Sequence, residues 1–294
     1  MEIRRVFMTL AFLALAGWSL TTVHAQVSQS QLKTEGDEPL LREWIKVLAS
    51  DEFGGRKPMT PFEDKTVNYL ARQLEEIGLE PAFDGSWFQP FNMIAVTAKP
   101  DERGDTIYNG AADNASGMAG ALLTAKKMKA LPQPRRSVLF LFPSSKESGL
   151  FGSEYYCAHP AIEMKKTVAC LNFESIGPAE LTRDVVILGG GESPLDNYYI
   201  AAAAAQGRYI FFDDDNSDGW FFRSDHYNFV KKGVPAVVLE NGQHPVDVSK
   251  PNKYPMPVWY HKPSDEYHED WDLGGTLANV NLLFSVALSL ANGY

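Results

Sequence analysis

The order of apolar and polar residues predicts helices and strands that alternate along most of the chain. Apolar residues recur at helical spacing in 67–77, where Thr60 and Pro61 supply an N-terminal cap and Gly78 a stop. Comparable patterns predict further helices at 40–48, 116–131, 149–157, 195–206 and 277–290. Short apolar runs predict strands at 92–98, 137–142, 168–173, 184–188 and 234–240. This alternation is typical of an α/β fold.

The predicted strands at 137–142 and 168–173 are apolar on both faces, which suits a sheet covered by helices on both sides. We therefore predict an α/β three-layer sandwich with a mostly parallel, mixed central sheet. The chain shows no internal repeat and no change of composition along its length. A single domain over 39–294 is the resulting expectation.

The first 25 residues resemble a secretory signal peptide. They have a basic start, an apolar run from Val6 to Leu20, and small residues at Val23 and Ala25. We expect cleavage after Ala25, a flexible polar lead-in at 26–38, and a secreted or periplasmic protein. No later apolar run approaches the roughly 20 residues of a membrane span, so none is expected after cleavage.

Charge and cysteine content exclude some classes of protein. The formal net charge is −10, and −11 without the leader, and no stretch is rich in lysine or arginine. A nucleic-acid partner is therefore not expected. Two cysteines, Cys157 and Cys170, are too few for a disulfide framework or a cysteine-based zinc module. A single bridge and two buried thiols both fit the sequence.

Candidate chemistry lies at the ends of the predicted strands, where open α/β sheets bind ligands. Asp113 precedes the helix at 116–131, Glu147 follows the strand at 137–142, and Glu174 ends the strand at 168–173. Taken singly, such residues are most often helix caps or surface charges. Together with a later histidine, His261, they could hold a divalent metal such as zinc.

The segments around these residues resemble motifs of metallopeptidase family 28, the zinc exopeptidases that include bacterial aminopeptidases and, as relatives, glutaminyl cyclases. The matching segments are NGAADNASG at 109–117, KESGLFGS at 146–153, NFESIG at 172–177, SDH at 224–226 and YHKPSD at 260–265. Residues 48–56 also resemble the secreted bacterial members. The resemblance implies a zinc-exopeptidase type of α/β fold, of the phosphorylase/hydrolase-like kind, and hydrolysis of amino-terminal residues from peptides.

The resemblance implies a two-zinc site. Asp113 would bridge the two zinc ions. Glu147 and His261 would be the further ligands of one zinc ion, and Glu174 with an upstream histidine those of the other. This chain has no histidine between the leader and His159, and Lys146 stands where the family has its general-base glutamate. We therefore expect at most one tightly bound zinc, with Lys146 replacing the lost metal's charge by pairing with Glu174 or Glu147.

Two functional hypotheses follow, with a peptide as the substrate or ligand in both. The chain is an impaired zinc aminopeptidase, or a pseudopeptidase whose cleft binds peptides or a partner. A third alternative is a single-zinc enzyme like the glutaminyl cyclases, because Asp113, Glu147 and His261 match the one-metal set of those relatives.

Other residues are weaker candidates. His226 with Asp225 could replace the lost ligand, although this place in the family pattern is a structural loop. His244 and His268 are expected to be solvated loop residues. The acidic run Asp213–Asp215, with Asp218, fits either a calcium site or an acidic surface loop. Pocket lining and ordinary packing explain the following aromatic residues equally well: Trp87, Phe88, Tyr254 and Trp259.

Overall fold

The computed structural model describes residues 35–93, 104–174, 176–191, 193–213, 219–249 and 259–293. The expected leader at 1–25, most of the lead-in and most of the strand expected at 92–98 lie outside the described residues.

Four strands form one mixed sheet in the order β1-β4-β2-β3. They are β1 (Cys170–Leu171), β4 (Ala236–Asn241), β2 (Asp184–Leu188) and β3 (Tyr209–Asp213). β1 runs parallel to β4 and β2 runs parallel to β3, whereas β2 and β4 are antiparallel. Two of the three strand pairs are therefore parallel, as predicted.

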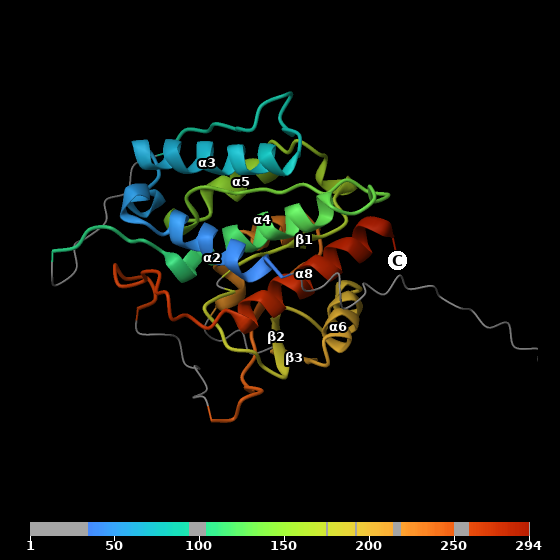
Figure 1. The fold of residues 1–294 in the computed structure, drawn as a ribbon. Helices are drawn as coiled ribbons and strands as arrows, with labels where there is room; N and C mark the ends of the chain where they lie inside the picture. Colours follow the sequence, from blue (N-terminus) through green and yellow to red (C-terminus); the bar gives the residue numbers. More distant parts are fainter. Residues whose placement is uncertain are drawn as a thin grey trace, which may run out of the picture.

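Helices cover the sheet on both faces. The main core holds residues from the sheet and from α2 (Asp37–Leu48), α4 (Ser116–Lys129), α6 (Leu195–Ala205) and α8 (Gly274–Asn292). Figure 1 shows α2, α4 and α8 side by side, in agreement with their contacts. The opposite face is covered by α5 (Phe151–Ala158), η5 (Trp220–Phe222) and α7 (His226–Val230).

The alternation of side chains along β2 shows why the sheet needs two helical layers. Val185 and Ile187 belong to the main core, whereas Val186 and Leu188 pack with Val238 and η5 on the other face. All five residues of β2 are buried. The predicted three-layer arrangement is confirmed.

The helix α3 (Pro61–Ile77) is capped by the residues that predicted it. The Thr60 hydroxyl accepts a hydrogen bond from the Phe62 N–H at 3.3 Å, and Gly78 ends the helix with a φ of 88°. The Glu63 carboxylate accepts from the Met59 N–H at 2.6 Å, so the return bond of the capping box reaches one residue further back.

The strand predictions need three corrections. Residues 137–142 are not a strand, the strand predicted at 168–173 is reduced to two residues, and β3 was not predicted. Apolar composition provides a buried face but no ladder partner, and 137–142 pairs with no described strand. Val138 and Leu139 are accordingly 38% exposed each. β3 was missed because it lies at the sheet edge, is only partly buried, and runs into the acidic segment.

The structure bears on two further expectations from the sequence. Cys157 and Cys170 are free thiols in the cluster beneath α5, so they are not bridged, and burial raises the pKa of Cys157 to about 11. Helix α8 is long and apolar enough to cross a membrane by length and composition, but 67% of that stretch is buried inside the molecule. Contacts with α4 and α6 explain its apolar sequence.

Candidate metal centre and cleft

Asp113 lies in η2 (Ala111–Ala115), immediately before α4. The Asp265 carboxylate accepts hydrogen bonds from the N–H groups of Ala112 and Asp113 at 2.9 and 3.0 Å. Gly110 precedes them with a φ of 55°, and a Cβ there would lie 2.4 Å from the Asp113 carbonyl oxygen. These contacts fix the main chain that presents Asp113.

A half-buried arginine, Arg56, supports the same turn. The Arg56 guanidinium donates to the carbonyl oxygens of Leu48, Asn109 and Gly110 at 2.7, 2.6 and 2.9 Å. Burial lowers the pKa of Arg56 to about 10, so the side chain remains charged at neutral pH. Arg56 thereby ties the end of η1 (Asp51–Arg56) to the turn that carries Asp113.

Lys146 occupies the centre of the predicted site. It begins η3 (Lys146–Ser148), and its Nζ lies 2.5 Å from Glu174, 2.8 Å from Asp113 and 2.8 Å from Glu147. Its side chain is 14% exposed. Burial by itself would lower the pKa of Lys146, but the three carboxylates raise it well above its ordinary value. Lys146 is therefore a fixed cation that cannot accept a proton, and its partners include Asp113 as well as the two expected.

Glu174 is held on its other side by the SDH segment. Its Oε2 accepts a hydrogen bond from the Ser224 hydroxyl at 2.9 Å, and Asn172 donates to the same hydroxyl at 2.7 Å. Burial, helped by the charge of Asp113, raises the pKa of Glu174 to about 7 despite the opposing effect of Lys146. Ser224 thus orients the carboxylate that faces Lys146.

The donor atoms of Asp113, Glu147 and His261 lie within 4.8 Å of one another and could hold one metal ion. His261 Nε2 is 3.0 Å from Asp113 Oδ2 and 3.2 Å from Glu147 Oε2, whereas Lys146 contacts the other oxygen of each carboxylate. Hydrogen bonds with His261 and Lys146 outweigh burial and hold the pKa of Asp113 well below its ordinary value. Two carboxylate oxygens and one imidazole nitrogen suit a single zinc ion.

A second metal ion does not fit the described residues. Asp113 Oδ1 and Glu174 Oε1 already bind Lys146, and among the described residues no histidine other than His261 joins the metal-binding group. His226, the candidate replacement, is 0% exposed and packs edge-on against Phe221 at 4.8 Å between ring centroids. It is not part of the metal-binding group.

Glu240 was not among the predicted site residues, although it is the penultimate residue of β4 and its charge interacts with this cluster. Burial, followed by the charges of Glu174 and Asp113, raises the pKa of Glu240 to about 8 against the effect of Lys146. Because β4 is parallel to β1, both strands end at the same edge. Glu174 was predicted because it is a carboxylate at the end of an apolar run. The same rule applied to the apolar run at 234–240 would have indicated Glu240.

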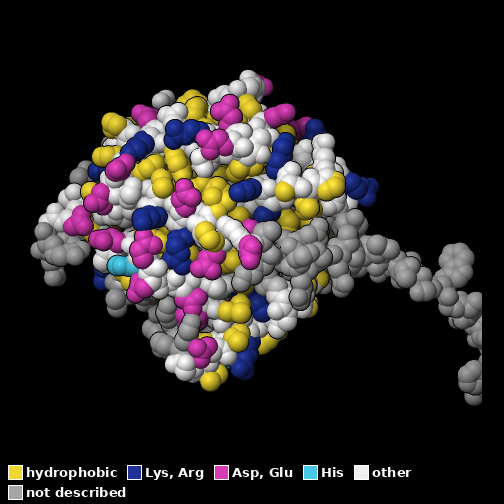
Figure 2. Space-filling model, viewed as in Figure 1, with side chains coloured by type: hydrophobic (Ala, Val, Ile, Leu, Met, Phe, Trp, Pro, Cys, Tyr) yellow, Lys and Arg dark blue, Asp and Glu magenta, His cyan; other side chains and the backbone are white. Residues whose placement is uncertain are grey.

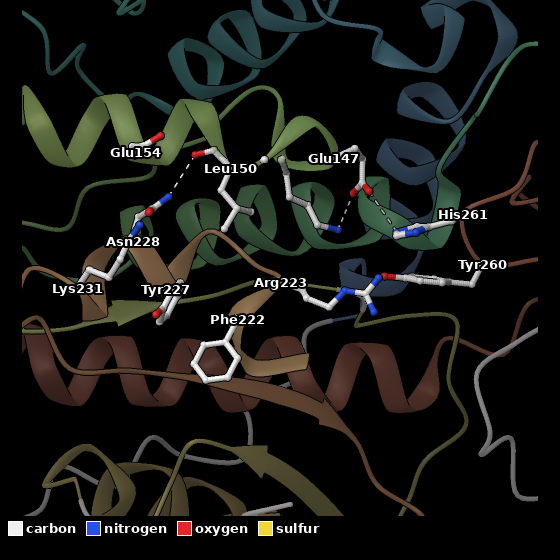
Figure 3. A pocket seen from close by; sticks show the side chains of 12 residues that line it. Glu147, Leu150, Glu154, Phe222, Arg223, Tyr227, Asn228, Lys231, Tyr260 and His261 are labelled. Atoms are coloured by element: carbon white, nitrogen blue, oxygen red, sulfur yellow. Dashed lines mark hydrogen bonds and ion pairs between the residues drawn. The ribbon is translucent and has the colours of Figure 1, made fainter. Parts of the chain in front are cut away.

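A cavity of about 580 Å³ opens beside the candidate metal group. Figure 3 shows Glu147, His261 and Tyr260 on one side and Lys231 and Glu154 on the other. Its aromatic lining comes from Phe222, Tyr227 and Tyr260 rather than from the candidates Trp87, Phe88 and Trp259, while Tyr254 lies outside the described residues.

The other weak candidates lie away from the cavity or beyond the described residues. His244 is exposed and lies 3.1 Å from Asp184, and His268 is exposed beside Trp271. Of the acidic run, Asp213 ends β3, and residues 214–218 lie outside the described residues.

Comparisons with known proteins bear on the family and the fold. The family model "Peptidase family M28" matches residues 89–285. The LapA aminopeptidase of Legionella pneumophila is 16% identical with a TM-score of 0.69, and the match covers 98% of this chain and 77% of that chain. A glutaminyl cyclase of Bacteroides thetaiotaomicron is 16% identical with a TM-score of 0.54, covering 87% of this chain and 97% of that chain. No curated protein matches.

An aminopeptidase from Aneurinibacillus sp. strain AM-1 is 26% identical with a TM-score of 0.48. That match covers 62% of this chain and 40% of the Aneurinibacillus chain, so this chain spans less than half of that protein. The Legionella and Bacteroides structures share the present fold.

Proposed function

The chain belongs to peptidase family M28, and from this premise we propose that it binds the amino-terminal end of peptides at a single-zinc centre and hydrolyses them very slowly. The observation that carries the proposal is the position of Lys146. Its ammonium group lies within 2.8 Å of Asp113, Glu147 and Glu174, where a second cation would otherwise be needed.

The residues divide into a metal-binding set and a charge-balancing set. Asp113, Glu147 and His261 would hold the zinc ion, which supplies a Lewis acid for a peptide carbonyl. Lys146 balances the carboxylates and orients Glu174 from one side, while Ser224 orients it from the other. Because Lys146 stays protonated, the chain lacks the family's general base, a loss of about 10²- to 10⁴-fold in rate.

Export belongs to the same proposal. The signal-peptide pattern at 1–25 supports a secreted or periplasmic protein, where extracellular peptides would be the ligands.

A one-metal cyclase like the glutaminyl cyclases is the second candidate, favoured by the three-residue ligand set. Lys146 counts against it, because an ammonium group stands where that chemistry also needs a carboxylate. Cyclisation of an amino-terminal glutamine peptide, assayed beside hydrolysis, separates the two candidates.

Metal analysis tests the centre. After dialysis against a zinc buffer, the wild type should retain between zero and one equivalent, and His261→Ala should retain none. His268→Ala is the matched control, because His268 is exposed and outside the metal-binding group. Two equivalents in the wild type would contradict the single-metal centre.

Turnover on a panel of aminoacyl-nitroanilides with added zinc tests the chemistry. We expect rates orders of magnitude below those of a two-metal peptidase, and no recovery in Lys146→Glu, because the upstream histidine is still absent. Glu147→Ala controls for contaminating peptidases. Ordinary turnover that Glu147→Ala abolishes would overturn the proposal of slow hydrolysis. Complete inactivity together with peptide binding would make the chain a pseudopeptidase.

A further inference from the structure

The cavity beside the metal group is lined by two cations that have no ion-pair partner in the described part of the chain. Three basic side chains line it: Lys146, Arg223 and Lys231. Lys146 is surrounded by three carboxylates. Arg223 and Lys231, by contrast, form no ion pair with any carboxylate among the described residues. Both are exposed to the solvent that fills the cavity.

Aromatic rings hold these two cations in place. The Arg223 guanidinium lies 4.3 Å from the centroid of the Trp220 ring, and Lys231 Nζ lies 5.4 Å from the centroid of Tyr227. A guanidinium stacked on an aromatic ring still has its N–H groups free for a ligand oxygen. Neither cation therefore needs a protein carboxylate to fix its position.

The same aromatic contacts connect Arg223 to the metal group. The Trp220 ring meets Tyr260 edge-on at 6.0 Å, and Tyr260 stacks on His261 at 3.8 Å. Figure 3 shows Arg223 pointing toward Tyr260, on the side of the cavity where His261 and Glu147 lie. A ligand at His261 thus lies near a guanidinium held at a fixed position.

The opposite charge is available for an amino group. Glu154 lines the cavity, is exposed and forms no ion pair among the described residues, whereas both oxygens of Glu147 already contact Lys146 and His261. A ligand with an amino group and a carboxylate would match the charges on both sides. An uncharged or purely cationic peptide would leave Arg223 without a partner.

Resting on the proposed function, we propose that Arg223, assisted by Lys231, selects short peptides that carry a carboxylate close to the amino terminus. The carboxylate is either the side chain of an amino-terminal aspartate or glutamate, or the terminal carboxylate of a dipeptide. Arg223 donates to that carboxylate while the peptide amino group faces Glu154.

Calorimetric titration of zinc-dialysed protein distinguishes the two sources. The pair Glu-Ala-Ala-amide and Gln-Ala-Ala-amide isolates the side-chain carboxylate, and Ala-Ala against Ala-Ala-amide isolates the terminal one. In at least one pair we expect the carboxylate ligand to bind about tenfold more tightly.

Substitutions of Arg223 and Lys231 test whether these cations cause the preference for the carboxylate ligand. Arg223→Gln should reduce the preference to about twofold or less, Lys231→Gln should reduce it partly, and Arg223→Lys should restore part of it. Lys232→Gln is the matched control, an exposed neighbour of Lys231 that does not line the cavity. It should leave the preference unchanged.

Failure of this inference is distinguishable from failure of the proposed function. Equal binding within both pairs, or a preference that survives Arg223→Gln, would overturn the role of Arg223. N-acetyl-glutamate tests the carboxylate contact without a free amino terminus. If it binds through Arg223 and no peptide binds, the proposed function fails and Arg223 remains an anion site. If none of these carboxylate ligands binds, both fail.

Discussion

At the scale of single residues, Lys146 decides what the cleft can do. Three carboxylates within 2.8 Å of one ammonium form a group in which each member depends on the others for its charge balance. Lys146, Asp113 and Glu174 are largely buried, whereas Glu147 is exposed. Removing the buried ammonium group is costly, because the buried carboxylates are then left without a compensating charge.

Replacing Lys146 by methionine should therefore couple stability to metal. Without metal, we expect Lys146→Met to lose about 3–5 kcal/mol of unfolding free energy, because Asp113, Glu147 and Glu174 then repel one another. Zinc should restore much of that loss and bind more tightly than to the wild type. Thermal melting with zinc and with a chelator measures both effects. Lys65→Met removes an exposed lysine paired with Glu52, and it should show neither the loss of stability in chelator nor the added stabilisation by zinc. A variant as stable as the wild type in chelator would contradict the charge-balancing role.

His226 makes a second prediction at this scale. Burial lowers its pKa to about 4 from an ordinary 6.5, and neither ring nitrogen has a hydrogen bond of normal geometry within the described part of the chain. The unfolded chain therefore binds a proton that the folded chain rejects between these two values. The contribution of His226 to stability should be full above pH 6.5 and fall by about 3 kcal/mol as the pH drops to 4. The raised pKa values of Glu174 and Glu240 act in the opposite direction, so the His226 contribution is measured against a variant.

Urea unfolding at pH 7.5 and pH 5 covers about 2 kcal/mol of this contribution. Between these two pH values, His226→Leu should gain about 2 kcal/mol of unfolding free energy relative to the wild type, whereas His268→Leu, at an exposed position, should follow the wild type. An unchanged pH dependence in His226→Leu would assign the loss to other groups.

At the scale of elements, the site depends on one junction, the set of hydrogen bonds between Asp265 and η2. The Asp265 carboxylate accepts hydrogen bonds from the N–H groups of Ala112 and Asp113, and its backbone carbonyl oxygen accepts one from the Ala111 N–H. The loop that carries His261 is thereby attached to η2, which carries Asp113, so two candidate ligands share one support.

Asp265→Asn tests that support. The amide keeps the shape but offers one acceptor atom in place of two, and its NH₂ group faces a backbone N–H. We expect a loss of about 1–3 kcal/mol in unfolding free energy and weaker zinc binding. Glu266→Gln, an exposed neighbour, should change neither quantity in urea unfolding and zinc titration. Full zinc affinity in Asp265→Asn would show that the junction does not position the ligands.

Helices could be predicted from the sequence because their signals are local. Thr60, Pro61 and Gly78 lie within the helix they start and stop, and the structure uses each of them. Strands depend on a partner remote in sequence, so the apolar run 137–142 was predicted as a strand that the structure lacks. Similarly, motifs identified Asp113 and Lys146, but only the fold shows that they touch.

At the scale of the whole molecule, the sequence carries a net charge of −10 and no stretch rich in lysine or arginine. Figure 2 shows acidic and basic side chains interspersed over one face.

Export is the remaining whole-molecule prediction. Cleavage after Ala25 should leave Gln26 as the first residue, because Val23 and Ala25 are the small residues that signal peptidase selects. Intact mass of the exported protein measures the new terminus, with protein retained in the cytoplasm as the comparison. A Met1 terminus in the exported fraction would contradict the prediction.

A cation supplied by a side chain differs from a bound ion in one further respect. Lys146 has no dissociation rate, is present at one copy per chain from synthesis onward, and cannot be withdrawn by a competitor for metals. A centre that takes both of its cations from solution depends on their supply. In this chain the ammonium group of Lys146 compensates the three carboxylates without any bound ion, so under the proposed single-zinc centre only binding or turnover at that centre would respond to a shortage of zinc.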